Sequence, residues 1–316
     1  MSELLKGLVV KDQSGFYWVE VENNRTYICR LRGRLMEEAQ SSDIATIGDK
    51  VSIQTVDEET GIVEAVEERE SALSRAARTE GNRGAGEALR EQVIIANADQ
   101  ALFVFAAASP APNFKMLDRF LITGEKSGIE KLMIVVNKID LEDPTQIRAL
   151  FAPYEQMGYR VVYTCALSGI GVDSLQEVLA EKISVFTGPS GVGKTSLLNV
   201  IQPGLGRSVK AVSQRREEGL HTTRDSELIK IAPKTYIADT PGIRTLNLWD
   251  IEPEELDAYF IDIAPYVEKC RFGNCAHENE PGCAVREAVE SGEISRSRFK
   301  SYKQLRTELE DIYAVY

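Results

Sequence analysis

The stretch Gly188-Pro189-Ser190-Gly191-Val192-Gly193-Lys194-Thr195 decides the fold of this chain. It follows the apolar run Ile183-Ser184-Val185-Phe186 and precedes Ser196-Leu197-Leu198-Asn199-Val200, which has the composition of a helix start. A G-x-x-x-x-G-K-[ST] sequence between a strand and a helix is the phosphate-binding loop, or P-loop, of nucleotide-binding α/β domains. Its glycines let backbone N–H groups turn toward phosphate oxygens, and the helix N-terminus adds a positive dipole end. We predict that residues 188–196 bind the phosphates, with Lys194 at the β- and γ-phosphates and Thr195 on Mg²⁺.

A second motif, Asn137-Lys138-Ile139-Asp140, follows an apolar run that ends at Val136, and it predicts which base is bound. A carboxylate at Asp140 accepts hydrogen bonds from guanine N1–H and the 2-amino group, whereas adenine presents no such donor pair on that edge. A site built around a specific hydrogen bond strongly rejects the analogue that lacks it. We therefore expect Asn137, Lys138 and Asp140 to bind guanine.

The stretch Thr164-Cys165-Ala166-Leu167-Ser168 follows another predicted strand. It is similar to the short loop that, in GTPases, offers a backbone N–H to guanine O6. This adds Cys165 and Ala166 to the candidate nucleotide site. The alternative for Cys165 is a small buried residue with no role in binding.

Two further segments predict the groups around the γ-phosphate. Asp239-Thr240-Pro241-Gly242 follows an apolar strand, so we expect Asp239 to reach Mg²⁺ through water and the Gly242 N–H to meet the γ-phosphate. His221-Thr222-Thr223-Arg224 lies in a polar loop, where Thr222 or Thr223 can bind Mg²⁺ only when the γ-phosphate is present.

The residue after Gly242 bears on catalysis. Ras-like enzymes carry a glutamine there that positions water, but this chain has Ile243, which cannot polarise water. We therefore expect slow intrinsic turnover. His221 is the candidate catalytic residue that orients the water, and a surface-loop histidine without that role is the alternative.

The order of these segments is unusual, because the base-reading motif at 137 precedes the P-loop at 188. In the usual GTPase order the P-loop comes first. A helix over residues 172–182 would run directly into the strand at 183–187, and this short connection joins the two chain ends of the usual GTPase order. The new ends of the domain would then lie before residue 93 and after Gly242. Chain ends that lie close together make such a circular permutation feasible.

The remainder of residues 93–248 fits an α/β domain. Buried apolar runs alternate with helical patterns, which predicts a mostly parallel sheet covered on both faces. The predicted strands are 101–105, 132–136, 160–163 and 183–186, and the predicted helices include 114–126 and 172–182.

The first 70 residues read instead as short strands separated by Gly, Asn, Asp and Ser. Five such runs predict a small OB-like β-barrel over residues 1–70, with a purely structural β-module as the alternative. The runs are 7–10, 16–21, 25–31, 50–53 and 61–66. Residues 71–92, rich in Arg, Ala, Gly and Glu, predict a flexible linker.

Residues 249–316 predict a helical domain around a metal site, with helices over 284–291 and 297–313. Cys270, Cys275, His277 and Cys283 supply three thiolates and one imidazole within 14 residues. Such a set suits a closed, tetrahedral, structural Zn²⁺ site, with one ion per chain and no open position for catalysis. The metal would supply much of the folding energy of so small a module.

Composition bounds the remaining possibilities. The chain has 316 residues, a net charge of −12 and a sequence pI near 4.9, so it is too long for one ordinary domain and is not built for non-specific binding of polyanions. It shows no apolar run long enough for a membrane span and no signal-peptide pattern at its start. Clustered cysteines fit metal binding in a reducing cytosol better than disulfides. We expect a cytoplasmic protein without membrane association.

Taken together, these motifs resemble the circularly permuted GTPases of the ribosome-small-subunit-dependent GTPase A family, the RsgA/YjeQ-like proteins. The resemblance spans nearly the whole chain and includes Cys29-Arg30-Leu31-Arg32-Gly33, Gly48-Asp49-Lys50-Val51 and Leu73-Ser74-Arg75. It implies a multidomain fold with a permuted P-loop GTPase domain, an OB-like barrel and a helical zinc module. It also implies a GTP hydrolase that acts in late maturation of the small ribosomal subunit and is stimulated by it. We expect the protein to be a monomer. Arg224 and Leu220 depart from the family pattern beside His221.

The resemblance also implies contact with rRNA. Arg30, Arg32 and Arg34 alternate along a predicted strand, which would place them on one barrel face. Arg296, Arg298, Lys300, Lys303 and Arg306 form a basic segment of the last helix, for which a merely solvated face is the alternative. Two other functions remain open: a permuted GTPase serving another ribonucleoprotein, and a zinc-stabilised RNA adaptor whose nucleotide is only structural.

Overall fold

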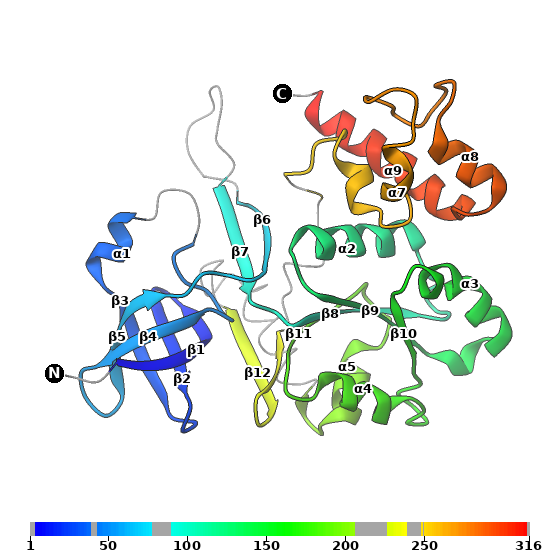
Figure 1. Cartoon of the computed structure of the whole chain (residues 1–316). Helices are drawn as coiled ribbons and strands as arrows, with labels where there is room; N and C mark the ends of the chain where they lie inside the picture. The colour runs from blue at the N-terminus through cyan, green and yellow to red at the C-terminus, as the bar shows by residue number, and fades with distance from the viewer. Residues whose placement is uncertain are drawn as a thin grey trace.

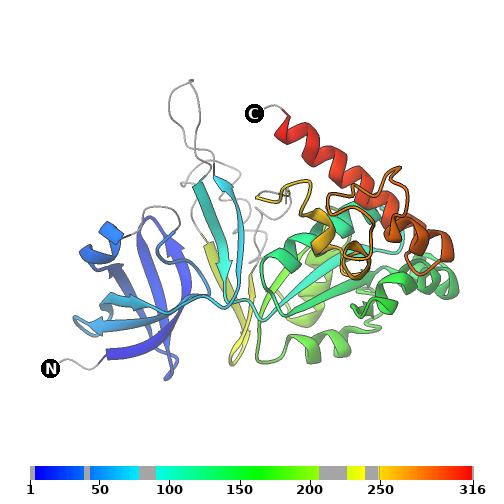
Figure 2. The ribbon, with the colours of Figure 1, turned by 45° about the horizontal axis from the view of Figure 1, so that its top comes forward.

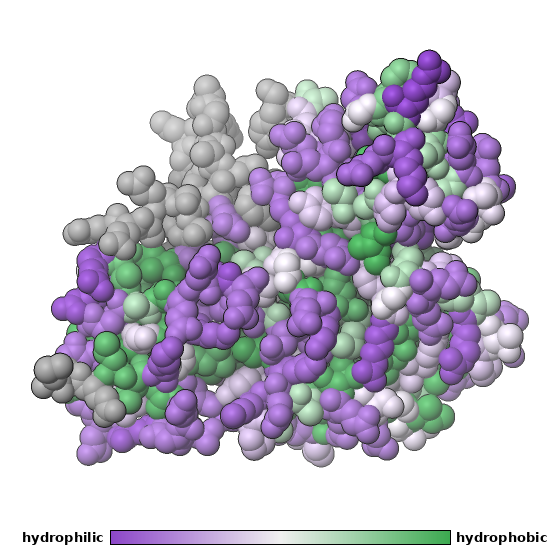
Figure 3. Space-filling model, viewed as in Figure 1, coloured by the Kyte–Doolittle hydropathy of each residue, from purple (hydrophilic) through white to green (hydrophobic). Residues whose placement is uncertain are grey.

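The computed structural model describes residues 4–38, 43–77, 90–205, 226–238, 248 and 250–314. Figure 1 shows a β-barrel beside an α/β domain, with a C-terminal group of helices above the α/β domain. On the face shown in Figure 3, hydrophobic residues form small patches separated by hydrophilic ones. Within the described ranges, no helix is both long enough and apolar enough to span a membrane.

The N-terminal strands form a closed barrel. Their order is β1-β2-β3-β5-β4, and β4 pairs back with β1, so the ring has no open edge. Side chains alternate between interior and surface along β2 and β3, with Val19, Tyr27 and Cys29 inside. This confirms the predicted OB-like barrel. The elements are β1 (Leu4–Gln13), β2 (Phe16–Val21), β3 (Thr26–Leu31), the short helix α1 (Gly33–Glu38), β4 (Lys50–Thr55) and β5 (Thr60–Val66).

The α/β domain is built on strands in the order β10-β9-β8-β11-β13-β12, which are parallel except that β12 is antiparallel to β13. This confirms the predicted parallel sheet of a permuted GTPase domain. The strands are β8 (Gln100–Ala106), β9 (Lys131–Asn137), β10 (Arg160–Tyr163), β11 (Ile183–Thr187), β12 (Ser226–Ala232) and β13 (Thr235–Ala238).

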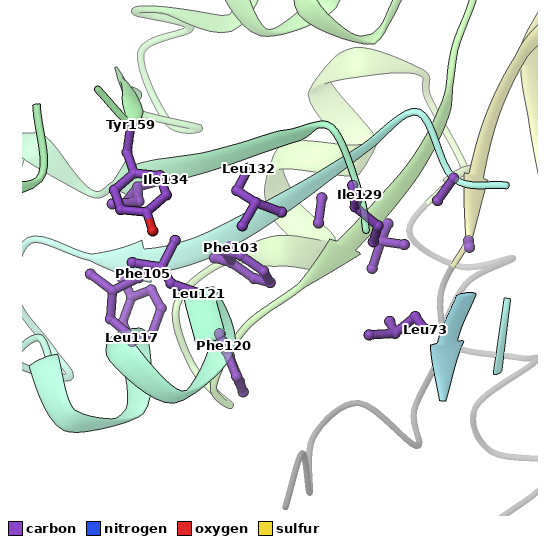
Figure 4. Packing of buried hydrophobic residues seen from close by; sticks show 14 of the residues in the cluster. Leu73, Phe103, Phe105, Leu117, Phe120, Leu121, Ile129, Leu132, Ile134 and Tyr159 are labelled. Atoms are coloured by element: carbon purple, nitrogen blue, oxygen red, sulfur yellow. The ribbon is translucent and has the colours of Figure 1, made fainter. Parts of the chain in front are cut away.

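Helices cover both faces of this sheet because alternate residues of each central strand point to opposite sides. Phe103 and Phe105 of β8 pack on one side with Phe120 of α2, as Figure 4 shows, and Leu102 and Val104 pack on the other. Figure 1 accordingly shows α2 and α3 on one face and α4 and α5 on the other. The helices are α2 (Phe114–Lys126), the 3₁₀ turn η1 (Ile139–Leu141), α3 (Pro144–Gln156), α4 (Val172–Leu179) and α5 (Lys194–Ile201).

Two sequence predictions need correction in this region. The helix predicted over 172–182 ends at Leu179, because Ala180 is extended and Glu181 has a positive φ. The flexible linker predicted over 71–92 is wrong at its ends: β6 (Ala72–Ala77) and β7 (Arg90–Ala96) pair antiparallel, and residues 78–89 lie outside the described residues. Figure 2 shows this strand pair standing between the barrel and the α/β domain.

A strand that the sequence analysis missed joins the barrel to the GTPase sheet. β12 pairs with β13 on one edge and with β1 of the barrel on the other, through Lys11 opposite Glu227 and Asp12 opposite Ser226. Glu20 of β2 accepts hydrogen bonds from Lys230 Nζ and from Tyr236 Oη, each at 2.6 Å. The two domains therefore share one continuous sheet.

The C-terminal helices pack against α2 of the GTPase domain. A shared apolar core includes Ile122 from α2, together with Phe260, Tyr302 and Leu305. The predicted helices over 284–291 and 297–313 are confirmed as α8 and α9. The elements are η3 (Leu256–Tyr259), α7 (Ala264–Val267), α8 (Ala284–Ser291) and α9 (Arg296–Tyr313).

The basic segment of α9 does not form one exposed face, which corrects the interpretation of it as an RNA contact. Arg298 is 1% exposed and donates to Asp118 of α2 and, at 2.8 Å, to Asp262. Arg306 is also buried and donates to Tyr302 Oη and Glu310. Arg296, Lys300 and Lys303 are exposed. Some basic residues of α9 are therefore buried in an interface and others are exposed to solvent. The composition of the segment does not distinguish the buried ones from the exposed ones.

Candidate functional site

The P-loop lies at the carboxyl edge of the parallel sheet, directly after β11. Gly188 has a φ of +156°, and a Cβ there would lie 2.0 Å from the carbonyl oxygen of Val104, so only glycine fits this turn. Lys194 begins α5, and its Nζ donates to the carbonyl oxygens of Gly188 and Pro189 at 2.6 and 2.7 Å. The lysine is thus held over its own loop, where phosphate oxygens would replace the two carbonyl acceptors.

Asn137, at the end of β9, connects the base-reading motif to the P-loop. Its Nδ2 donates to the Val192 carbonyl oxygen at 2.9 Å, and a Cβ on Gly193 would lie 2.4 Å from that nitrogen. Its Oδ1 accepts from the Ala166 N–H at 3.2 Å. Because Asn137 is 1% exposed, its side-chain amide is held in place between these two loops. One buried side chain therefore holds three loops together, although 51 residues separate Asn137 from Gly188 (188 − 137).

Asp140 lies at the open side of this arrangement. Its side chain is exposed, and its Oδ1 accepts a hydrogen bond from Cys165 Sγ at 3.0 Å. Cys165 is buried, and its backbone N–H donates to the Ile170 carbonyl oxygen at 2.9 Å. The thiol therefore orients a carboxylate that remains free to accept from a base. The sequence predicts Cys165 near the base but not this contact, since its one signal in the sequence is a thiol in the loop after β10.

Lys138 takes a left-handed conformation with φ of 60°, and its Nζ donates to the Ser109 carbonyl oxygen. This places its aliphatic stem beside the P-loop, since a Cβ on Gly193 would lie 3.8 Å from Lys138 Cε. Together, the loops after β8, β9, β10 and β11 meet at one edge of the sheet. Ligands of open α/β sheets bind at this edge.

The groups predicted around the γ-phosphate fall outside the described residues: Asp239, Gly242, His221, Thr222 and Thr223. The strand that leads to Asp239 is described. β13 ends at Ala238, which is paired with Val185 of β11, so the strands preceding the two motifs are neighbours in the sheet.

The four predicted metal ligands come together in the C-terminal module. The ligand atoms of Cys270, Cys275, His277 and Cys283 all lie within 4.8 Å of one another. His277 Nδ1 is 3.3 Å from Cys283 Sγ, and Cys270 Sγ is 4.0 Å from Cys283 Sγ. Tetrahedral bonds of about 2.3 Å to sulfur place ligand atoms about 3.8 Å apart, so the set fits one Zn²⁺.

Asp257 completes this cluster, and the sequence analysis missed it. Its Oδ2 lies 3.2 Å from His277 Nε2, which leaves Nδ1 facing the sulfur atoms. A carboxylate on the outer nitrogen of a ligating histidine fixes its tautomer. Burial raises the pKa of Cys275 to about 12 and also raises that of Cys283, so the thiols alone are protonated and a cation is needed to hold them as thiolates.

The three arginines predicted to share a barrel face take different positions. Arg30 is exposed on β3, with its guanidinium 4.5 Å from the ring centre of Phe16. Arg32 pairs with Glu64, and Arg34 lies in α1 and donates to the Glu64 carbonyl oxygen. The predicted strand alternation thus ends with β3 at Leu31, and Arg34 does not continue it.

Comparisons with known proteins agree with this geometry. The family model for the RsgA GTPase matches residues 66–249, and that for the RsgA N-terminal domain matches residues 6–63. A protein of Gemmatimonas aurantiaca named small ribosomal subunit biogenesis GTPase RsgA is 40% identical over 311 residues, covering 98% of this chain and 99% of the relative. A protein of the same name from Moorella thermoacetica is 39% identical over 300 residues, covering 94% and 95%.

Two solved structures are similar over almost their full length. The crystal structure of YjeQ from Thermotoga maritima has a TM-score of 0.79 and 34% identity, covering 97% of this chain and 99% of that one. The structure of YloQ, described as a circularly permuted GTPase, has a TM-score of 0.73 and 31% identity, covering 98% and 96%.

Proposed function

The chain belongs to the RsgA GTPase family and is a GTP hydrolase, and on this premise we propose that it acts on the small ribosomal subunit. The curated relatives are named for biogenesis of that subunit. In this proposal the protein binds the subunit and its rRNA in late maturation, in the cytoplasm and as a monomer. The bound subunit accelerates GTP hydrolysis.

The observation that carries the nucleotide assignment is the contact of Asn137 with both Val192 and Ala166. It makes a guanine-binding edge from loops whose sequence order is permuted. Asp140 would accept from the base, and Lys194 would exchange its two carbonyl acceptors for phosphate oxygens. Thr195 and Asp239 are the proposed Mg²⁺-binding residues. The bound Mg²⁺ would neutralise negative charge on the phosphates during phosphoryl transfer.

His221 is the proposed water-orienting residue, and Thr222, Thr223 and Gly242 are the proposed γ-phosphate contacts. Their support is sequence position and the family resemblance. Because Ile243 cannot polarise water, basal turnover should be slow and stimulation by the subunit large.

The zinc module is proposed to be structural and to form one contact of the protein with the subunit. Cys270, Cys275, His277 and Cys283 would hold one Zn²⁺, which supplies a fixed fold and no open coordination position. The chain after Gly242 leads to this module, and Lys126 of α2 pairs with Asp250 at 2.8 Å on the way. Loss of the γ-phosphate would then reposition the module and release the subunit.

The decisive experiment measures GTP turnover with and without purified small ribosomal subunits, with large subunits as the control. We expect strong stimulation by small subunits only. Stimulation by a different ribonucleoprotein alone would favour the first alternative function. Nucleotide that binds but is not hydrolysed under any of these conditions would favour a zinc-stabilised RNA adaptor. In either case the proposal is wrong.

A further inference from the structure

The junction between the barrel and the GTPase sheet contains a polar cluster that lies away from the nucleotide site. Glu20 of β2 accepts hydrogen bonds from Lys230 Nζ of β12 and from Tyr236 Oη of β13, each at 2.6 Å. Asn24 Oδ1, in the turn after β2, accepts from the same ammonium at 2.9 Å. One barrel carboxylate therefore holds two neighbouring strands of the other domain. We call this cluster the junction clamp; its residues are Glu20, Asn24, Lys230 and Tyr236.

The surroundings of the junction clamp make its contacts strong. The side chain of Glu20 is 15% exposed and that of Lys230 is 33% exposed. Burial and the Glu20 carboxylate raise the pKa of Tyr236, so the phenol keeps its proton and donates it to the carboxylate. Hydrogen bonds that involve a charged group are roughly twice as strong as those between neutral groups. The clamp therefore fixes the distance and the direction between the two domains better than apolar packing would.

Backbone pairing gives the junction a second point of attachment. β1 pairs with the first residues of β12, where Lys11 lies opposite Glu227, and Figure 1 shows β12 beside the barrel strands. Lys230, which Glu20 holds, lies further along the same strand and is paired with Tyr236 of β13. Two attachment points along one strand fix its direction as well as its position. The orientation of β12 and β13 therefore depends on the barrel.

The two clamped strands adjoin the proposed hydrolytic groups in sequence. β12 begins three residues after Thr223, in the segment that also contains His221, and β13 ends at Ala238, the residue before Asp239. The loops that bind the base follow β9 and β10, and the P-loop follows β11. A change in the orientation of β12 and β13 should therefore alter hydrolysis and leave nucleotide binding intact.

We propose that Glu20, a residue of the barrel, is a positioning residue for GTP hydrolysis and acts through Lys230 and Tyr236 on the strands beside the catalytic segments. This inference rests on the proposed function for the roles of His221 and Asp239. A displacement of about 1 Å at a reacting group costs a large factor in rate, even when its cause lies far from the chemistry. A positioning role predicts a loss of kcat, with KM for GTP and the affinity for GDP retained.

The test measures kcat and KM for GTP, and calorimetric binding of GDP, in the full-length chain with Glu20→Ala. We expect kcat to fall on the order of tenfold, with KM and GDP affinity within about twofold of the parent. Glu67→Ala is the matched control, since Glu67 pairs with Lys6 at 2.9 Å within the barrel, and it should leave all three values unchanged. An unchanged kcat in folded Glu20→Ala, or an equal loss of kcat and GDP affinity, overturns the proposal.

Further variants test whether the clamp contacts themselves carry the effect. Tyr236→Phe deletes one hydroxyl and should lower kcat about threefold. Because Tyr236 and Glu20 share one hydrogen bond, adding Tyr236→Phe to Glu20→Ala should slow the enzyme no further. The exchanged pair Glu20→Lys with Lys230→Glu restores opposite charges and should recover most of the kcat that Glu20→Lys alone loses. Fully additive losses, or no recovery by the exchanged pair, overturn the proposal.

Stability and subunit stimulation separate this inference from its alternatives. A clamp that only stabilises the junction would lower the melting temperature of Glu20→Ala and leave its kcat unchanged, which overturns the positioning role. If Glu20→Ala fails to fold, Tyr236→Phe still tests the proposal, and an unchanged kcat in that variant overturns it. Absent stimulation of the unmodified chain by small subunits would instead refute the proposed function, because the comparison of basal kcat values does not depend on the subunit.

Discussion

The proposed guanine pocket and the interface between α2 and α9 are both assembled from segments far apart in the chain, but their charged side chains have opposite surroundings. In the pocket, Asp140 is exposed, and the Lys194 ammonium is held by two backbone carbonyls that phosphate can replace. At the interface, Arg298 is 1% exposed and already paired with the carboxylates of Asp118 and Asp262. The pocket keeps its charges available to a ligand, whereas the interface neutralises them within the protein.

This difference separates residues that serve chemistry from residues that hold domains together. Burial by itself lowers the pKa of Arg298, but the neighbouring carboxylates outweigh it and the pKa is raised, so the guanidinium stays charged. Arg298 also lies 4.5 Å from the Phe260 ring centre, in the core shared with the zinc module. We therefore expect substitutions at the interface to change stability and substitutions in the pocket to change nucleotide chemistry.

The largest effect is expected at the interface. Arg298→Ala leaves the buried carboxylate of Asp118 and the partly buried carboxylate of Asp262 without their cationic partner, and it should lower the free energy of unfolding by about 3–5 kcal/mol. Chemical denaturation measures this. The matched control is Lys300→Ala on the exposed side of the same helix, which should change stability by less than about 0.5 kcal/mol. Similar stabilities for the two variants would remove the distinction between the regions.

The next effect is expected in the pocket. Lys194→Ala removes a charge aimed at the transferring phosphate and should reduce subunit-stimulated GTP turnover by roughly 10²–10³-fold. The melting temperature should stay within about 2 °C of the parent, because the hydrogen bonds of the Lys194 ammonium to the Gly188 and Pro189 carbonyl oxygens lie within its own loop. A large fall in melting temperature would show that the pocket lysine is also structural.

A smaller effect is expected at Cys165. This residue combines a structural position with a role in the pocket, because it is buried and also orients Asp140. Cys165→Ala should weaken GDP binding about threefold to tenfold, the value of one modest hydrogen bond, because a thiol is a weak donor. Cys165→Ser keeps a donor and should restore most of the affinity. Calorimetric titration of GDP measures both variants, and equal weakening by alanine and serine would indicate a packing role alone.

The smallest effect concerns the solvent-exposed edge of the α2–α9 interface. Burial alone raises the pKa of Glu308, but hydrogen bonds from Arg119 and Lys115 outweigh it and hold the pKa below its ordinary value of 4.5. The stability that these contacts of Glu308 contribute is therefore fully present above the pKa of Glu308 in the unfolded chain. It is lost as the pH falls through the lowered pKa of Glu308 in the folded protein. Glu308→Gln should cost at most about 1 kcal/mol at pH 7 and flatten the acid side of the stability profile. An unchanged acid profile would contradict this account.

Much of the fold and of the pocket follows from sequence because the residues responsible have fixed spacing. The P-loop must pass from strand to helix through glycine, and the metal ligands must lie near one another in a short segment. Both constraints can be recognised from the order and spacing of residues in the sequence. The exchange of motif order is visible for the same reason, and the structure places the loops that contain Asn137, Ala166 and Val192 in contact.

The features that were missed depend on contacts between distant segments without such spacing. Arg298 meets Asp118 across 180 residues, and nothing in the α9 pattern distinguishes it from exposed Lys300. Pairing of β12 with β1 depends on how the barrel docks, since two residue pairs join them within the described part of the chain. Asp257 contacts His277 from a separate turn. The strands β6 and β7 escape period-two alternation because β6 ends in two alanines and β7 begins with three polar residues.

The central claim is that segments in permuted order form one guanine pocket, and nucleotide selectivity of Asp140→Asn tests it most directly. An amide at residue 140 can donate to the C2 oxygen of xanthine but cannot accept both hydrogen bonds from guanine. We predict that GDP affinity falls by on the order of 100-fold or more while affinity for xanthosine diphosphate rises, with the fold unchanged. Unchanged GDP affinity in this variant would contradict the account.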